Sequence, residues 1–303
     1  MNEIVVISGK GGTGKTSVCA AFAHLMHDGI ICDLDVDAPD LHIILEPDYA
    51  AKHVFVSGHE ANIDQDSCTR CGECARLCRF ESILENETGY AVDPLRCEGC
   101  GVCAALCPAE AIRLTDKLCG EWYESQSRFG PMIHAQLAPG EENSGRLVTL
   151  LKQKARERAK EQGLETILCD GSPGIGCPVI SSLSGASMAV AVVEPTPSGR
   201  HDFARIADLC DHFRIPVCVI INKSDLSSSE CEAIEGICAL RGYLIAGKLP
   251  FSNDVVSAMI RKRAVTETES RLASAVESAW EAVTGNLAAR KNEKISPVSR
   301  LSP

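Results

Sequence analysis

Short apolar runs alternate along this chain with stretches whose apolar residues follow helical spacing. The runs are rich in Val and Ile, which is typical of strands buried on both faces, and they lie at residues 4–7, 30–32, 166–170, 188–194, 216–222 and 243–250. After the first run, we expect a helix that stops at Gly29 and whose apolar face carries Val18, Ala21, Phe22, Leu25 and Met26. Strands that alternate with helices predict an α/β fold with a doubly wound, mostly parallel sheet.

Further elements follow from local patterns. Residues 116–146 contain aromatic and glycine-rich stretches that favour a β-hairpin or paired strands. Residues 146–162 combine Arg, Lys and Leu as in an amphipathic helix, whose basic face we expect to be solvated. A helix should begin near His201, and a terminal helix should cover residues 267–288. The tail beyond them is predicted to be disordered.

The composition is that of a globular protein with an unusual number of cysteines. Of 303 residues, 45% are hydrophobic and 23% are charged. A net charge of −11 argues against non-specific binding to nucleic acid or to an anionic membrane, and the longest apolar runs are far shorter than the ~20 residues of a membrane span. The chain enters its first strand at once, without a signal peptide. We therefore expect the 17 cysteines to be thiols or metal ligands in a reducing cytoplasm.

A glycine-rich segment connects the first apolar run to the first predicted helix. It reads G-x-x-x-x-G-K-[ST], the phosphate-binding P-loop pattern, over Gly9, Lys10, Gly11, Gly12, Thr13, Gly14, Lys15, Thr16 and Ser17. Its glycines let backbone N–H groups surround phosphate oxygens, and the helix start adds a partial positive charge. We expect Lys15 to reach the β- and γ-phosphates and the Thr16 hydroxyl to bind Mg²⁺. A turn that binds nothing is the alternative, which the strand–loop–helix context disfavours.

Acidic residues follow two of the predicted strands. Asp33, Asp35 and Asp37 come after the second run, and Asp170 ends the run at 166–170 shortly before Gly174. Alone, the first group would be a solvated acidic turn, but behind a P-loop we expect these acids near Mg²⁺ and the γ-phosphate. The N–H of Gly174 can lie near that phosphate, and its glycine-rich segment can order differently with ATP and with ADP.

Two cysteine runs with the same internal spacing interrupt the alternating pattern. C-x₂-C-x₂-C-x₃-C occurs at Cys68, Cys71, Cys74 and Cys78 and again at Cys97, Cys100, Cys103 and Cys107. This is the bacterial ferredoxin pattern for two [4Fe–4S] clusters, in which the fourth cysteine of each run ligates the other cluster. The first cluster is thus assigned to Cys68, Cys71, Cys74 and Cys107, and the second to Cys97, Cys100, Cys103 and Cys78.

Two features qualify this assignment. Zinc is the alternative metal, but it needs closed four-cysteine sites, and the doubled run disfavours it. Arg79 stands where the pattern has proline, whereas the second run keeps Pro108. We expect a changed turn or potential at the second cluster rather than loss of the site.

The early lysine of the P-loop carries a family resemblance. With Lys10 and Lys15 both present, the segment resembles the deviant Walker A of the MinD/ParA/nitrogenase-iron-protein class of P-loop ATPases. The resemblance implies that Lys10 reaches the partner's nucleotide across an ATP-dependent dimer. It also implies that Asp35 orients the attacking water and contacts the Mg²⁺ shell, with Asp33 and Asp37 in support.

The later strand ends fit the same class. Asp170 resembles a Walker B acid that acts through the Mg²⁺ shell. Residues 222–225 match N-K-x-D, the guanine-reading motif of GTPases, so the base is open to question. In the class that the P-loop resembles, the asparagine at this position reads adenine. The resemblance therefore favours ATP over GTP, with Asn222 at the base.

The position of the cysteine runs extends the resemblance to most of the chain. A ferredoxin module between the second strand and the rest of a P-loop domain is similar to MinD-superfamily ATPases with an inserted ferredoxin domain, up to about residue 285. We accordingly divide the chain into a first part of the ATPase domain (1–61), an inserted ferredoxin-like α+β module (62–115), a second part of the ATPase domain (116–288) and a disordered tail (289–303).

The remaining cysteines have two interpretations. Cys177 follows Asp170 at the offset at which the nitrogenase iron protein carries a ligand to its dimer-bridging cluster. The resemblance makes it a candidate ligand of a third, shared cluster, with Cys119 as a conceivable second ligand, and a buried or free thiol is the alternative. Small core residues are predicted for Cys19, Cys32, Cys169 and Cys218.

These features support two main functions. The first is an Mg-ATPase whose ATP-driven dimer, with itself or with a paralogue, controls electron transfer through two [4Fe–4S] clusters to a redox partner. The second is an iron–sulfur carrier ATPase that delivers clusters to client proteins, although two complete ligand sets favour stable cofactors. A positioning switch like MinD or ParA is weaker, because no basic amphipathic C-terminal helix is evident. We expect no nucleic-acid or membrane partner.

Overall fold

The computed structural model describes residues 1–141 and 143–295 of the chain. Contacts divide it into two compact units, which are described separately. Unit 1 comprises Met1–Lys52, Trp122–Gln136 and the residues from Ser144 onward, and unit 2 comprises His53–Glu121 and Leu137–Asn143. The predicted insertion at 62–115 lies within unit 2, which also takes in flanking residues on both sides.

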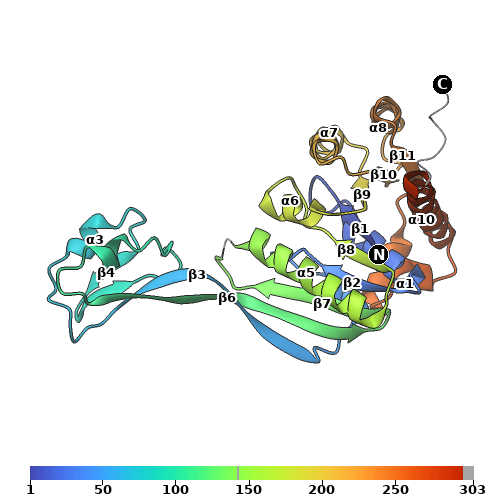
Figure 1. Cartoon of the computed structure of the whole chain (residues 1–303). Coiled ribbons are helices and arrows are strands. Elements are labelled where there is room, and N and C mark those ends of the chain that lie inside the picture. Colours follow the sequence, from blue (N-terminus) through green and yellow to red (C-terminus); the bar gives the residue numbers. More distant parts are fainter. Residues whose placement is uncertain (142, 296–303) are drawn as a thin grey trace, which may run out of the picture. The chain divides into compact units, whose positions relative to one another are not determined.

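Unit 1 is built on parallel strands in the order β11-β10-β9-β1-β8-β2-β7 (Figure 1). The order continues with β6 and β3, each of which has residues in both units. The strands are β1 Asn2–Ile7, β2 Gly29–Asp33, β3 Ala51–Ile63, β6 Ile112–Ser127, β7 Gly130–Leu137, β8 Thr166–Asp170, β9 Met188–Val193, β10 Val217–Asn222 and β11 Leu244–Leu249. The predicted α/β fold with a mostly parallel central sheet is therefore confirmed.

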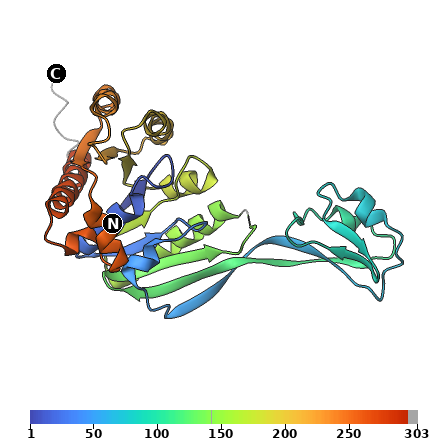
Figure 2. The same ribbon diagram turned by 180° about the vertical axis from the view of Figure 1, so that it is seen from behind.

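Helices cover both faces of these strands (Figure 1, and from behind in Figure 2). The helix α5 packs on β2 and β8, whereas α1 and α10 pack together beneath β1, β8 and β11. The bounds are α1 Lys15–Leu25, α2 Leu41–Leu45, α5 Ser144–Gln162, α6 Cys177–Leu183, α7 Pro197–His212, α8 Ser228–Arg241, α9 Asn253–Ile260, the 3₁₀ turn η1 Val265–Glu267 and α10 Arg271–Ile295. None of the helices in the described residues is long and apolar enough to cross a membrane.

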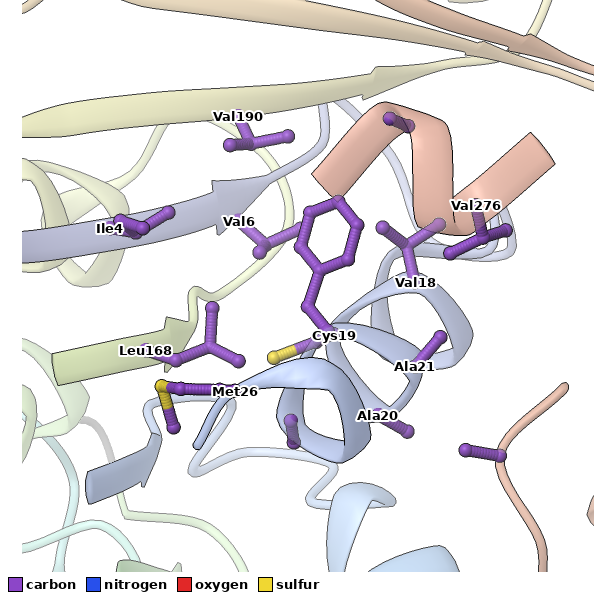
Figure 3. Packing of buried hydrophobic residues seen from close by; sticks show 14 of the residues in the cluster. Ile4, Val6, Val18, Cys19, Ala20, Ala21, Met26, Leu168, Val190 and Val276 are labelled. Carbon is purple, nitrogen blue, oxygen red and sulfur yellow. The ribbon is translucent and has the colours of Figure 1, made fainter. Parts of the chain in front are cut away.

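The core of unit 1 lies between α1, α10 and alternate residues of the central strands. Ile4 and Val6 of β1 pack with Val18 of α1 and Val276 of α10 in one buried cluster (Figure 3). This burial of apolar surface fixes α1, and therefore the loop before it, against the sheet. Cysteines also fill the core, as predicted, because four of them are fully buried: Cys19, Cys32, Cys169 and Cys218.

Several predicted boundaries are wrong. The helix α1 ends at Leu25 because Met26 is already extended (φ −82°, ψ 119°), and Gly29 begins β2 instead of stopping the helix. The helix α7 begins at Pro197, before the predicted start, since the Thr196 side chain accepts a hydrogen bond from the N–H of Gly199 and caps it. Residues 289–295, assigned above to the tail, continue α10, and residues 296–303 lie outside the described residues.

The basic face of α5 is not simply solvated, contrary to the prediction. Lys152 is buried, with its Nζ 2.7 Å from the carboxylate of Glu3. The same ammonium donates to the carbonyls of Ser181 (3.3 Å) and Ser184 (2.8 Å), near the end of α6. Arg156 binds the other oxygen of Glu3 at 2.8 Å. This network therefore ties α5 to β1 and to α6.

Unit 2 repeats one local structure in its two cysteine runs. Each run contains a short helix, α3 Glu73–Leu77 in the first and α4 Val102–Ala105 in the second. The residues before them, Gly72 and Gly101, both have a φ of 77°, in the left-handed region that favours glycine. Between the runs lies an antiparallel pair of strands, β4 Ile83–Asn86 and β5 Gly89–Val92. The sequence repeat is thus also a structural repeat.

Candidate functional site

The P-loop lies between β1 and α1, at the carboxyl end of the central strands. Gly12 and Gly14 have φ values of 78° and 91°. A Cβ on Gly14 would lie 2.3 Å from Nδ2 of Asn222, so only glycine fits there. Among the residues that the structure describes, no side chain caps the start of α1. Its first N–H groups are therefore available for an anion, as the phosphate-binding prediction requires.

Lys15 is buried against two acidic residues of the site. Its Nζ lies 2.8 Å from Oδ1 of Asp170 and 3.3 Å from Oδ2 of Asp35. Burial by itself would lower the pKa of this ammonium, but the carboxylates of Asp170 and Asp35 outweigh burial, and the pKa is raised. Lys15 is thus held charged in the P-loop, next to two of the residues predicted to surround Mg²⁺.

The acidic residues that follow β2 and β8 converge. Asp33 and Asp170 are opposite each other in the register of these strands, and each has a buried oxygen, Oδ2, without a hydrogen-bond partner among the described residues. Burial, and then the charge of Asp170, raises the pKa of Asp33. Burial also raises the pKa of Asp35 and of the more exposed Asp37. Carboxylate oxygens that lack partners suit a hard divalent cation such as Mg²⁺.

The segment after β8 is held against the P-loop. Gly174 has a φ of 92°, and its N–H donates to the carbonyl of Ser8 at 2.9 Å. The hydroxyl of Ser172 donates to the carbonyl of Leu34 at 2.7 Å. The structure thus places Gly174 beside the P-loop, but its N–H is engaged. A contact with a γ-phosphate would require this hydrogen bond to open.

The side chain of Lys10 contacts the segment that follows β9 in the same chain. Its Nζ is 3.1 Å from Oε2 of Glu194, 3.4 Å from the Thr196 hydroxyl and 3.2 Å from the Ser198 hydroxyl. Glu194 also binds Lys223 at 2.9 Å. Glu194 was not among the residues predicted for the site. Its position at the end of a strand, like that of the aspartates, was the available signal.

A cavity of about 230 Å³ opens beside the P-loop. It is lined by Gly14, Ser17, Val18, Asn222, Lys223, Leu249, Pro250, Phe251, Ser252, Val255, Val256, Val265, Leu272 and Val276. An apolar lining with a few polar groups is typical of a site for a planar base. Asn222 was predicted at this site. The lining residues from α9 and α10, which come from later parts of the chain, were not predicted.

Two side chains of the N-K-x-D segment bond to backbone groups around the site. Nδ2 of Asn222 donates to the carbonyl of Thr13 at 2.7 Å. The carboxylate of Asp225 accepts a hydrogen bond from the backbone N–H of Phe251 at 2.6 Å. Asp225 thus supports the loop that lines the cavity. One of its two carboxylate oxygens, Oδ1, is engaged in this contact.

Four cysteines from both runs line one cavity in unit 2. The cavity, of about 20 Å³, is lined by Cys68, Cys71, Cys74 and Cys107, together with other residues that include Tyr90 and Pro108. The fourth cysteine of the second run thus lies with the first three of the first run. This is the grouping that the ferredoxin spacing predicts.

Backbone N–H groups point at the sulfur atoms of both runs. Arg70, Ser82, Ala61 and Ala111 donate to Cys68, Cys78, Cys97 and Cys107 at 3.4, 3.4, 3.5 and 3.4 Å. In the second run, burial and then the charges of Cys97 and Cys100 raise the pKa of Cys103. Hydrogen bonds to sulfur stabilise thiolates and tune the potential of iron–sulfur clusters.

The eight cysteines of the two runs are not arranged around a single metal ion. Within the residues that the structure describes, no group of three or more Cys, His, Asp or Glu side chains is placed to hold one metal ion. In a [4Fe–4S] cluster each thiolate binds a different iron, so the sulfurs surround the cluster instead of meeting at one point. Six of the eight cysteines pack around Ala61, Ile63, Ile83 and Ile112, whereas Cys71 and Cys100 are exposed.

Cys177 and Cys119 differ in environment. Cys177 is the first residue of α6 and is exposed. Cys119 belongs to unit 2, is buried and donates its S–H to the carbonyl of Ser57 at 3.0 Å. In the described part of unit 1, every cysteine other than Cys177 is buried. A symmetric pair of chains would thus supply two exposed thiols from unit 1, half of a four-cysteine set.

Comparison with known proteins places the chain in a family. Residues 4–265 match the CobQ/CobB/MinD/ParA nucleotide-binding domain, and the chain belongs to this family. With its complete P-loop, it is an ATP-binding ATPase of the MinD/ParA type. Two proteins of Methanocaldococcus jannaschii are similar to it. MJ0578 is 30% identical over 92% of this chain and 95% of its own length. MJ0579 is 25% identical over 75% of this chain and 83% of its own.

Solved structures share the fold. The cell division ATPase MinD of Pyrococcus furiosus superposes with a TM-score of 0.58 and 15% identity, over 94% of this chain and 99% of that one. MinD of Pyrococcus horikoshii, complexed with Mg-ADP, gives a TM-score of 0.57 and 17% identity, over 96% and 98%. At these identities the likeness establishes the α/β architecture with its large, mostly parallel sheet.

Proposed function

We propose that this ATPase is an ATP-driven dimer switch coupled to electron transfer through two [4Fe–4S] clusters. The observation that carries the proposal is the cavity lined by Cys68, Cys71, Cys74 and Cys107. These four residues form one predicted ligand set, although Cys107 is far from the others in sequence. The second set would be Cys97, Cys100, Cys103 and Cys78. When bound, such clusters accept and release single electrons.

Unit 1 would bind the nucleotide and sense its γ-phosphate. The N–H groups of the P-loop and Lys15 would hold the phosphates, and the cavity beside Asn222 would take the base. Thr16, Asp35 and Asp170 would hold Mg²⁺, for which the buried, unpartnered oxygen of Asp170 is the support. The N–H of Gly174 donates to the carbonyl of Ser8. If this hydrogen bond opened, the N–H could bind a γ-phosphate, and the segment after β8 would adopt a second arrangement.

The partner across the dimer would be a second copy or a paralogue. The Pyrococcus furiosus and Pyrococcus horikoshii structures are of MinD proteins. Lys10, the early lysine of the P-loop, supports the ATP-dependent dimer that the family resemblance implies. Two different relatives come from one organism. A heterodimer of paralogues therefore stands beside the homodimer. A redox protein would receive or supply the electrons. The bridging cluster at Cys177 is not part of this proposal, because unit 1 offers too few exposed thiols.

Cluster delivery to client proteins is the second candidate function. The exposure of Cys71 and Cys100 favours it, since one ligand of each cluster would then be open to an accepting protein. The other six cysteines pack against apolar residues of unit 2. That packing favours clusters that stay bound.

Anaerobic EPR of the reduced protein, with and without Mg-ATP and with an iron count, tests the proposal. We expect about eight irons per chain and a spectrum or potential that changes with ATP. The matched control is Cys238→Ala, a buried cysteine of α8 outside both runs, which should keep the full iron content. Transfer of iron to an apo-protein acceptor on addition of ATP would replace electron transfer by delivery. A protein that binds no iron after reconstitution would contradict both functions.

A further inference from the structure

Glu194 connects two lysines of the phosphate site. Its Oε2 lies 3.1 Å from Nζ of Lys10, and its Oε1 lies 2.9 Å from Nζ of Lys223. Lys223 in turn donates to the carbonyl of Gly12 at 3.1 Å. One carboxylate thus holds the early lysine of the P-loop and, through Lys223, the glycine turn of the same loop.

The carboxylate is placed to stay charged. Its side chain is 15% exposed, in the segment where β9 ends. Burial alone would raise the pKa of Glu194, but the hydrogen bonds from Lys223 and Lys10 outweigh burial, and the pKa is lowered. Glu194 therefore presents a full negative charge to Lys10 at neutral pH. Charge-assisted hydrogen bonds of this kind are stronger than neutral ones.

Lys10 cannot hold these contacts and also reach another nucleotide. Apart from Glu194, the partners of its Nζ among the described residues are the hydroxyls of Thr196 and Ser198, which are in the same segment. A phosphate in a second subunit would have to replace these acceptors. The strength of the pair with Glu194 therefore enters the free energy of dimer formation directly.

We propose that Glu194 is a positioning residue that keeps Lys10 within its own subunit until ATP draws it to the partner. This inference rests on the proposed ATP-dependent dimer and adds to it a residue that opposes premature pairing. Lys223 would remain on Glu194 in both states and preserve the tether to Gly12. The device would make dimer formation depend more steeply on bound ATP.

Glu194→Gln separates this role from simple support of the P-loop. Glutamine keeps one oxygen that can accept from Lys223, but it removes the charge that holds Lys10. We expect the ATP concentration at half-maximal dimer formation, measured by analytical ultracentrifugation, to fall about five- to tenfold, the scale of one partly buried ion pair. The Kd for Mg-ADP, measured by calorimetry, should change less than about twofold.

Two comparisons show whether Lys10 carries the effect. Glu230→Gln removes a carboxylate that pairs with Arg200 at 2.8 Å, away from the P-loop, and should leave the midpoint unchanged. In a Lys223→Met background, Glu194→Gln should still lower the midpoint, since the effect acts through Lys10. A shift that disappears in this background, or a weaker Kd for Mg-ADP with a higher midpoint, would assign Glu194 to loop support and overturn the inference.

The outcomes also separate the inference from the proposed function. If the wild-type chain dimerises with ATP and Glu194→Gln leaves the midpoint unchanged, the dimer stands and the role of Glu194 is wrong. If the wild-type chain stays monomeric at saturating ATP and the variant dimerises, Glu194 restrains the dimer as inferred. If neither dimerises, the dimer and the inference both fail, while the iron and EPR measurements still decide the cluster function.

Discussion

Asp33 and Asp170 lie opposite each other on neighbouring strands, and each has a buried oxygen that accepts no hydrogen bond from the described residues. Lys15, 2.8 Å from Asp170, and the N–H of Asp35, which donates to Asp33 at 3.1 Å, reduce the repulsion between them. Two buried carboxyl groups thus face each other with little compensation. Such an arrangement is typical of sites that bind a divalent cation.

Asp33→Asn should therefore stabilise the nucleotide-free protein. The substitution removes a buried carboxyl group, whose ionised form is disfavoured by burial and by Asp170, while keeping the oxygen that accepts from the N–H of Asp35. We expect a gain of about 1–2 kcal/mol, or a rise of several degrees in Tm, measured by calorimetry without Mg²⁺. Addition of Mg-ADP should raise the Tm of the variant less than that of the wild type. Asp40→Asn, at an exposed position, is the control, and an equal shift there would contradict this account.

Much of this site was readable from the sequence because its residues come directly after apolar runs. The ends of β1, β2 and β8 meet at one edge of a parallel sheet, so the P-loop, Asp35 and Asp170 could be brought together from their positions alone. The sequence did not reveal contacts between elements that are far apart along the chain and follow no common motif. Glu194 with Lys10, and the cavity lining from α9, depend on tertiary packing that no local pattern encodes.

The positions of charged residues predicted their burial less well than the positions of apolar residues did. The prediction of a solvated basic face on α5 failed because Lys152 finds Glu3 and the carbonyls near the end of α6, all distant in sequence. Surface bias is only a statistical rule for lysine. The cysteine runs behaved in the opposite way, since their spacing alone predicted that Cys107 would lie with Cys68.

The cysteine grouping predicts a specific pattern of iron loss. In the proposed assignment Cys68 and Cys107 are in one ligand set, so Cys68→Ala/Cys107→Ala should lose one cluster and keep about four irons per chain. The same assignment puts Cys68 and Cys78 in different sets, so Cys68→Ala/Cys78→Ala should lose both. Iron analysis and EPR after anaerobic reconstitution measure this. If each run ligated its own cluster, the two double variants would show the reverse, and the crossed assignment would be wrong.

Lys152 should be more important for stability than any other tested lysine of α5. It is 3% exposed, and Lys152→Met would leave Glu3 with Arg156 alone and the carbonyls of Ser181 and Ser184 without this donor. Breaking a buried pair costs about 3–5 kcal/mol, so the midpoint of urea unfolding should fall clearly. Lys154→Met, in the same helix, removes a pair of partly exposed side chains with Glu157 and a contact with the Trp122 ring at 6.0 Å, and should change little. Equal effects of the two variants would contradict the network.

His134 should make unit 1 sensitive to acid. The ring is buried, contacts the Ser125 hydroxyl at 3.0 Å and stacks on Tyr123. Burial, and then the nearby His42, lowers its pKa from 6.5 to about 4. The folded state thus takes up a proton less readily than the unfolded state. The contribution of His134 to the free energy of unfolding should be fully present above about pH 6.5. It should fall as the pH drops toward 4 and level off below that, with a total loss of about 3 kcal/mol.

The variant His134→Gln isolates this contribution, because glutamine can still bond the Ser125 hydroxyl but does not titrate in this range. Urea unfolding between pH 4 and 7 should show a shallower loss of stability for the variant than for the wild type. His27→Gln removes a ring at an exposed position, where burial contributes nothing, and should keep the wild-type slope. Parallel curves for wild type and His134→Gln would mean that the ring is protonated in the fold as easily as in the unfolded chain, and its burial would then not account for any acid sensitivity.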